Sequence, residues 1–284
     1  MTQNGTPTLG KFGVWSIALR TDNAQTRDQA AELEALGYGA LWLPGGIGGA
    51  ILADCGHILG ATERVAVATG ILNVWRHDAT QVAAESLALG ERFLLGIGIS
   101  HAPLIGEAYK SPVAVLTRYL DDLDAAGHPA DRRIVAALGP KMLKLARDRA
   151  AGTHPYWVPV EHTAAARAAM GPGKLVAPEV TVALESDPAT ARALARQFMS
   201  IYLGLPNYTN NVLRFGFTPE DLADGGSDRL VDAIVAWGDE AAIAERIRQH
   251  HAAGADHVCL QVLGSPQDQV PIDALRRLAP ALIQ

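Results

Sequence analysis

Val65-Ala66-Val67-Ala68-Thr69-Gly70-Ile71-Leu72-Asn73-Val74-Trp75-Arg76-His77-Asp78 begins as a strand and ends as a polar loop. Its first five residues are apolar and rich in β-branched side chains, which predicts a short strand covered on both faces. A glycine, an amide, an indole, a guanidinium, an imidazole and a carboxylate follow. So many polar groups just past a core strand predict a ligand site at the strand's carboxyl end.

The same pattern repeats along the chain, with each apolar strand followed by a helix that often ends at a glycine. The predicted strands are 12–18, 40–43, 65–70, 93–99, 133–138, 154–158, 179–185 and 257–263. The rhythm breaks only at 204–238, where a short helix after Thr218 and a helix over 229–237 are expected. The pattern predicts one α/β domain over 1–284, a (β/α)8 barrel with a helical insertion between its seventh helix and eighth strand.

A doubly wound open sheet is the alternative fold. It would require a glycine fingerprint for a dinucleotide after the first strand, and Trp15-Ser16-Ile17-Ala18 is not one. A barrel places its site at the carboxyl ends of the strands.

Composition restricts the class of partner. Of 284 residues 49% are hydrophobic, the formal charge is −6, and no block of Lys or Arg stands out, which argues against nucleic acid or a membrane surface and for a small-molecule substrate. Cys55 and Cys259 are far apart, so neither a disulfide scaffold nor a zinc site is expected, and a reducing cytoplasm fits. Residues 1–10 do not read as a signal peptide, and no run approaches the roughly 20 apolar residues of a membrane span.

Gly139, Pro140, Lys141 and Met142 join the fifth strand to its helix. A glycine before a helix start leaves backbone N–H groups free for a phosphate, and lysines follow on the helix. An ordinary turn before a solvated basic helix is the competing interpretation.

The fourth strand ends in Gly98-Ile99-Ser100-His101-Ala102. The Gly-x-Ser-x-Ala spacing is close to the nucleophile elbow of α/β hydrolases, so a serine hydrolase with Ser100 as nucleophile is a hypothesis of another class. An elbow requires a helix directly after the serine, whereas a loop to about Pro112 is expected here.

His77 and Asp78 allow two interpretations. They could be a proton-transferring base and its orienting carboxylate, or Asp78 could cap the third helix. Trp75 and Trp157 suit a buried core as well as a ligand platform. The remaining histidines match no metal motif, so no metal site is predicted.

Taken together, these segments resemble the bacterial luciferase-like superfamily, and within it the actinobacterial oxidoreductases that use the deazaflavin coenzyme F420. The matching segments are 70–73 with 76–78, 92–101, 138–143, 152–156 and 253–258. The resemblance implies a cis peptide bond between Gly70 and Ile71 beneath the middle of the cofactor ring. It also implies that the cofactor contacts Leu72, Asn73 and Ser100 and that its phosphate binds the turn 139–142.

The implied reaction is hydride transfer between C5 of the deazaflavin and a small organic substrate, with His77 or His101 transferring a proton. An FMN-dependent monooxygenase that uses reduced flavin and O2 is the alternative, and a non-catalytic cofactor carrier is another. Relatives are commonly dimers or larger, so a homo-oligomer is expected. Where several relatives end the second strand with an acid and a histidine, this chain has Leu43-Pro44-Gly45-Gly46. Tyr208, Asn210 and Asn211 of the insertion suit a lid or pocket wall, or equally a surface loop.

Overall fold

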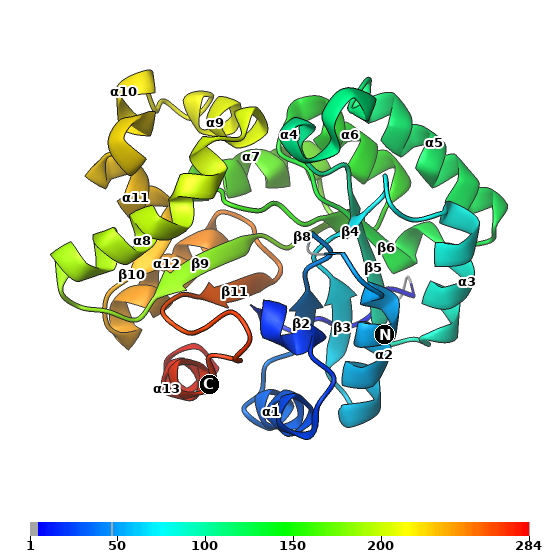
Figure 1. The fold of residues 1–284 in the computed structure, drawn as a ribbon, viewed down its shortest axis with the longest axis horizontal. Coiled ribbons are helices and arrows are strands. Elements are labelled where there is room, and N and C mark those ends of the chain that lie inside the picture. Colours follow the sequence, from blue (N-terminus) through cyan, green and yellow to red (C-terminus); the bar gives the residue numbers. More distant parts are fainter. Residues whose placement is uncertain (1–4, 47, 284) are drawn as a thin grey trace.

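A computed structural model of the chain describes residues 5–46 and 48–283 and contains a parallel sheet that closes into a barrel (Figure 1). The strands are β1 (Phe12–Trp15), β2 (Ala40–Leu43), β3 (Ala66–Thr69), β4 (Leu72–Asn73), β5 (Phe93–Gly98), β6 (Arg133–Val135), β7 (Gly152–Thr153), β8 (Leu175–Val176), β9 (Glu179–Ala183), β10 (Val235–Trp237) and β11 (Val258–Val262). Their order in the sheet is β10-β9-β11-β1-β2-β3-β5-β6-β7-β8, and β4 also pairs with β5.

Closure of the barrel depends on the short segment that joins β8 to β9. β8 pairs with β7, whereas β9 pairs with β11, and only Ala177 and Pro178 separate β8 from β9. The Ala177 N–H donates to the Thr153 carbonyl at 2.9 Å, and the Glu179 N–H donates to the Pro155 carbonyl at 2.8 Å. β8 and β9 therefore act as one bent strand that connects the two ends of the sheet, which confirms the predicted barrel.

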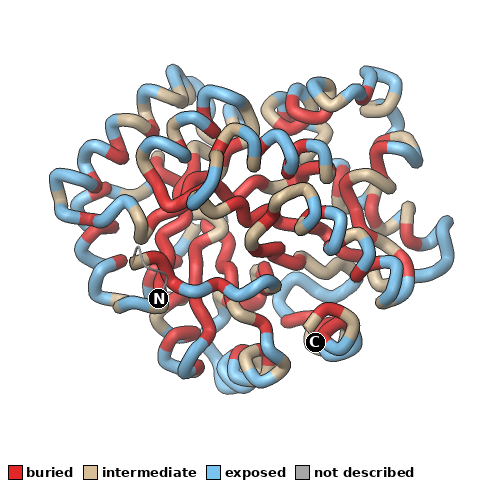
Figure 2. The backbone as a smooth tube through the Cα atoms, turned by 180° about the vertical axis from the view of Figure 1, so that it is seen from behind, coloured by how far each residue is buried: buried red, intermediate tan, exposed pale blue. Residues whose placement is uncertain are grey.

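Helices surround this sheet (Figure 1). They are α1 (Ala24–Ala35), α2 (Ile51–Ala61), α3 (Ala79–Ala88), α4 (Ala102–Ile105), α5 (Pro112–Ala125), α6 (Pro140–Arg149), α7 (Val160–Met170), α8 (Pro188–Leu203), α9 (Pro206–Leu213), α10 (Pro219–Leu222), α11 (Asp228–Ile234), α12 (Glu240–Ala252) and α13 (Ile272–Leu282), with 3-10 turns η1 (Ile17–Arg20), η2 (Gly106–Ala108), η3 (Ala130–Arg132) and η4 (Ala223–Gly225). The tube in Figure 2 is buried along the central strands and alternates between buried and exposed residues along the outer helices.

Successive residues of a strand enter different cores, because side chains alternate between the two faces of a sheet. In β3, Val67 packs outward against the helices, whereas Ala66 and Ala68 face the barrel interior. Small interior residues make room for Trp42, whose ring stacks on His154 with 4.2 Å between the ring centroids. The interior is thus a packed core, so a ligand has room to bind only at the mouth of the barrel.

Three local predictions were wrong. The strand expected over 154–158 is β7 (Gly152–Thr153), since Pro155 lacks an N–H and Trp157 has a left-handed φ of 56°. The helix expected over 229–237 ends at Ile234, and β10 follows because 235–237 pairs with the free edge of β9. A short helix, α4, stands where a loop was expected after Ser100.

Candidate functional site at the barrel mouth

The chain leaves the sheet briefly at the carboxyl end of β3. It advances four residues from Ala68 to Leu72, whereas the paired strand β5 advances three, from Leu94 to Ile97. The extra residue is a β-bulge, a distortion found next to many active sites. The bulge lies in the stretch where the sequence predicted a ligand site.

A buried threonine holds this bulge. The Thr69 hydroxyl donates to the Gly96 carbonyl at 2.6 Å and accepts from the Gly96 N–H at 2.8 Å. Because the side chain replaces the missing backbone pairing, no buried backbone group of Gly96 loses its partner.

Glycines of the neighbouring strand ends enclose Ile71. A Cβ on Gly45 would lie 2.3 Å from the Ile71 carbonyl oxygen, and a Cβ on Gly98 would lie 2.7 Å from its Cδ1. A Cβ on Gly45 would press on the Ile71 backbone, whereas a Cβ on Gly98 would meet only the end of the Ile71 side chain, which can move, so the backbone of the bulge is enclosed on the Gly45 side.

The Gly70–Ile71 peptide bond is cis, as the resemblance predicted. The Trp15 indole N–H donates to the Gly70 carbonyl at 2.8 Å. Gly70 and Ile71 are half-buried, whereas Leu72 and Asn73 are buried. Gly70 and Ile71 are thus the more accessible of these four predicted cofactor contacts.

Aromatic rings form one wall of the mouth. Trp15 lies 5.7 Å from Tyr156, measured between ring centroids, and Tyr156 lies 5.4 Å from Tyr202 of α8. Tyr208 of α9 lies 6.1 Å from Tyr156 and 5.0 Å from His101. The insertion expected over 204–238 therefore packs Tyr208 against this group of rings, and Figure 1 shows α9 (yellow) beside α4.

His101 is a neutral base in this wall. Its Nδ1 lies 3.0 Å from the Asn207 amide oxygen. Because that oxygen can only accept, Nδ1 carries the proton and Nε2 is left as a proton acceptor. Burial lowers the pKa of His101, although the hydrogen bond to Asn207 opposes this shift.

His77 has different surroundings. It is half-buried, and among the described residues it has no hydrogen-bonded partner. Burial lowers its pKa, the Glu85 carboxylate raises it, and Arg76 and Arg20 lower it again. Asp78 caps α3 by accepting the Gln81 N–H at 2.9 Å, which supports the capping interpretation over an orienting role toward His77.

Ser100 is half-buried with a left-handed φ of 56°. No histidine in the described part of the chain is hydrogen-bonded to its hydroxyl. α4 begins two residues after it, as helix Ala102–Ile105. The hydrolase hypothesis therefore has a turn of suitable shape but lacks the base that activates a serine.

The predicted phosphate turn opens α6. Gly139 is the N-cap residue and forms no side-chain cap, Pro140 and Lys141 are exposed, and Met142 is buried. Arg214, the C-cap residue of α9, extends over this turn, since a Cβ on Gly139 would lie 3.2 Å from its guanidinium. Arg214 has no carboxylate partner within the described residues, and burial lowers its pKa.

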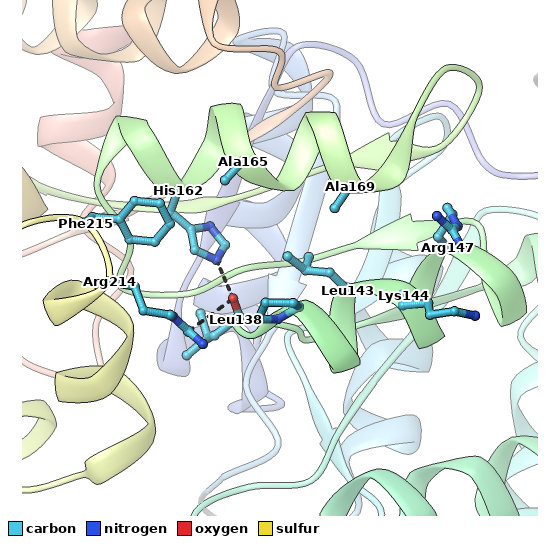
Figure 3. Close-up of a pocket in the computed structure, with 10 residues that line it drawn as sticks. Leu138, Leu143, Lys144, Arg147, His162, Ala165, Ala169, Arg214 and Phe215 are labelled. Atoms are coloured by element: carbon cyan, nitrogen blue, oxygen red, sulfur yellow. Dashed lines mark hydrogen bonds between the residues drawn. The ribbon is translucent and has the colours of Figure 1, made fainter.

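A groove of about 370 Å³ runs from this turn between α6 and α7 (Figure 3). Its lining is mainly apolar. Of its lining cations, Lys144 and Arg147 both pair with Asp148, whereas Arg214 instead donates to the Asn211 amide oxygen at 2.7 Å. The His162 Nε2–H donates to the Leu138 carbonyl across the groove floor, at 3.0 Å. Among the described residues, the lining cation without a carboxylate partner is thus Arg214, beside Gly139.

Glu179 lies in the barrel interior below the aromatic wall. It is 1% exposed and accepts from the Trp157 N–H at 3.2 Å and from the Thr181 hydroxyl at 2.7 Å. Burial raises the pKa of Glu179 to about 7. Trp157 itself is buried beneath Tyr202 and Tyr208, so it belongs to the core.

The sequence interpretation missed four residues of this site. Thr69 was assigned only to a strand, Tyr156 was placed within a strand, and Tyr202 was assigned only to a helix. Arg214 lies in the insertion, where no local pattern marks it. Only the rule that strand ends form the mouth could have drawn attention to Tyr156.

Two general properties bear on the class of site. No helix in the described parts of the chain has the length and apolar character to cross a membrane. Among residues 5–46 and 48–283, no three His, Cys, Asp or Glu side chains are grouped to hold a metal ion.

Comparison with known proteins agrees with the resemblance seen in the sequence. Residues 3–123 match the sequence model of the luciferase-like monooxygenase family. A search of curated proteins found no relative by sequence.

Solved structures share the fold. An F420-dependent secondary alcohol dehydrogenase, in complex with an F420–acetone adduct, has a TM-score of 0.74 and 16% identity, covering 98% of this chain and 100% of that one. The coenzyme F420 dependent tetrahydromethanopterin reductase from Methanopyrus kandleri has a TM-score of 0.68 and 16% identity, covering 97% and 99%. The oxygenating constituent of 3,6-diketocamphane monooxygenase from Pseudomonas putida, in complex with FMN, has a TM-score of 0.66 and 14% identity, covering 97% and 100%.

Proposed function

We propose that this chain, whose residues 3–123 match the luciferase-like monooxygenase family, is an F420-dependent oxidoreductase. It transfers a hydride between the deazaflavin and a small organic substrate. One observation carries the proposal. At one end of the barrel, a backbone bulge and a helix start without a side-chain cap occur together, and the helix start faces Arg214, which has no carboxylate partner among the described residues.

These two features match the two ends of a flavin-type cofactor. The bulge at Gly70 and Ile71, beside the Trp15 ring, is half-buried and uncharged, which suits a flat heterocycle. The start of α6 offers a helix N-terminus, and Arg214 adds a positive charge, which together suit a phosphate. Both follow the carboxyl ends of parallel strands that are separated in the sheet by β5 alone, so both lie at the same end of the barrel.

When bound, a deazaflavin accepts or donates a hydride at its C5. The protein's contribution is mainly position. The glycine-enclosed bulge would support the ring of a bound cofactor, and the tyrosines together with α9 would limit the space left for substrate and water beside it.

His101 is the best-placed residue to move a proton. Its Nε2 is an acceptor at the edge of the mouth, and its lowered pKa keeps it neutral at pH 7. In alcohol oxidation, Nε2 would take the hydroxyl proton as the hydride leaves carbon. We expect His101→Ala to reduce turnover about 100-fold or more with cofactor affinity unchanged, and His77→Ala to have the smaller effect. Normal turnover in both variants would contradict the assignment.

Titration of the purified protein with F420 and, separately, with FMN tests the proposal. Binding is followed by quenching of tryptophan fluorescence, because Trp15 lies at the bulge. We expect tight binding of F420 and weak binding of FMN. Binding of neither would refute the proposed cofactor class.

A flavin-dependent monooxygenase is the second candidate. The family match and the FMN complex among the similar structures favour it, and the α6 turn suits the phosphate of either cofactor. Preference for FMN, with oxygen consumption in the presence of reduced flavin, would establish this alternative in place of the first.

A further inference from the structure

Three side chains at the mouth form a directed hydrogen-bond chain. The Tyr156 hydroxyl donates to the Gln261 amide oxygen at 2.7 Å. The same hydroxyl lies 2.7 Å from the Tyr202 hydroxyl. Since Tyr156 has one proton and gives it to Gln261, Tyr202 must be the donor in the second bond.

This chain fixes the orientation of the Gln261 amide. With its oxygen held by Tyr156, the amide nitrogen points the other way and has two N–H donors to offer. The nitrogen has no hydrogen-bond partner among the described residues and is not among their buried unpaired atoms. Its donors are therefore accessible to solvent or to a ligand.

Gln261 faces the mouth of the barrel. It lies two residues beyond Cys259 in β11, and Cys259 packs in the barrel interior, so both side chains point inward. β11 pairs with β1 in a register of Leu260 with Val14, which places Gln261 beside Trp15. Trp15 in turn contacts the Gly70 carbonyl at the bulge.

We propose that Gln261, held by Tyr156 and Tyr202, is a specificity-determining residue that donates a hydrogen bond to a neutral carbonyl oxygen of the bound ligand. The inference rests on the proposed function. Two sources share this chemistry, namely a carbonyl of the cofactor's pyrimidine ring and the carbonyl of a ketone or aldehyde substrate.

A neutral carbonyl fits the local charges better than an anion does. Gln261 and the two tyrosines are uncharged, and burial raises the pKa of Tyr156 and of Tyr202, so both stay protonated donors. Glu179, when ionised above its raised pKa, exerts a negative field on both tyrosines. That field disfavours an anionic ligand. A chain of aligned hydrogen bonds also strengthens its terminal donor.

The test compares four proteins: wild type, Gln261→Glu, Tyr156→Phe and the control Gln197→Glu, which makes the same change at an exposed position of α8. Gln261→Glu replaces the two donors with acceptors, and Tyr156→Phe leaves the amide present but free to rotate. Affinities for F420, for FMN and, in the cofactor-loaded protein, for cyclohexanone are measured by fluorescence titration at pH 8. Thermal unfolding is measured in parallel.

We expect Gln261→Glu to weaken one ligand at least tenfold and Tyr156→Phe to weaken the same ligand three- to tenfold, with the control unchanged. A loss of F420 or FMN affinity assigns the bond to the cofactor. A loss confined to cyclohexanone assigns it to the substrate.

Wild-type affinities in both variants overturn the inference while leaving the proposed function intact. Failure of the wild type to bind either cofactor refutes the proposed function itself, and the inference with it. If Gln261→Glu does not fold, the affinities of Tyr156→Phe alone test the inference. This variant introduces no charge, and the inference still predicts that it binds the ligand more weakly.

Discussion

Gly45→Ala is the substitution that most directly tests how the bulge is held. The new Cβ would lie 2.3 Å from the Ile71 carbonyl oxygen and 3.0 Å from the Leu72 Cα, both backbone atoms that cannot rotate away. Ordinary contact needs roughly 3.5 Å, so the backbone must move by about 1 Å. Overpacking of this kind costs about 3 kcal/mol. For 284 residues the entropy of unfolding is roughly 600 cal/mol/K, so Tm should fall by about 5 °C.

Gly46→Ala is the matched control, because a Cβ on Gly46 would meet no atom of the described residues within 4 Å, its chain neighbours aside. Each variant is compared with the wild type by thermal unfolding and by F420 and FMN titration. A displacement of about 1 Å should weaken binding of whichever cofactor the wild type takes by roughly 100-fold in Gly45→Ala, whereas Gly46→Ala should behave as wild type. Equal Tm and equal affinity in the two variants would refute the argument that Gly45 encloses Ile71.

Three further predictions concern buried polar groups. Thr69→Val should cost about 3 kcal/mol more than Thr69→Ser in urea unfolding, because only valine leaves both backbone groups of Gly96 without a partner; equal losses would show that the hydroxyl is not needed. For Glu179, with a pKa of 4.5 when unfolded and about 7 when folded, the folded carboxyl keeps a proton that the unfolded one loses, so stability decreases as pH rises through this window. Between pH 5.5 and 7.5 the stability of wild type relative to Glu179→Gln should therefore fall by about 2 kcal/mol, and a constant difference would contradict the raised pKa. Buried histidines have the opposite effect on the pH dependence of stability, so stability decreases as pH falls. Below pH 6.5 the unfolded chain binds protons at these histidines that the folded chain does not bind. Each histidine should therefore destabilise the fold by about 2 kcal/mol at pH 5. Circular dichroism should show cooperative unfolding near that pH, since the sum approaches the whole stability of a typical protein, and a native spectrum at pH 4 would refute the assignment. The histidines, whose pKa burial lowers to about 3 or 4, are His128, His154, His162, His250 and His257.

Much of the barrel could be predicted because each unit carries its own local signals. Apolar strands of four to six residues, helix caps such as Asp78 and Asp187, and glycines after helices are all encoded within a few positions. One error arose where a distant segment decided the local structure. The chain at 235–237 became a strand only because the edge of β9 was free to pair with it.

The site was predicted in outline for the same reason. The bulge at Gly70 and Ile71 and the turn at Gly139 follow strands, so their place at the mouth followed from the fold. Which side chains face a ligand did not follow. Leu72 and Asn73 are buried although Gly70 and Ile71 before them are half-buried, because Leu72–Asn73 rejoins the sheet as β4.

The sequence alone determined the repeating strand–helix units, the end of the barrel at which polar residues gather, and the family resemblance, because periodicity and short motifs are local. The tertiary structure alone decided which distant residues meet there. Tyr156 and Gln261 are 105 positions apart, and Gly139 and Arg214 are 75 positions apart, yet each pair lies in contact. Barrel closure and the packing of α9 bring these pairs together. Such contacts cannot be predicted from a pattern within a short stretch of sequence.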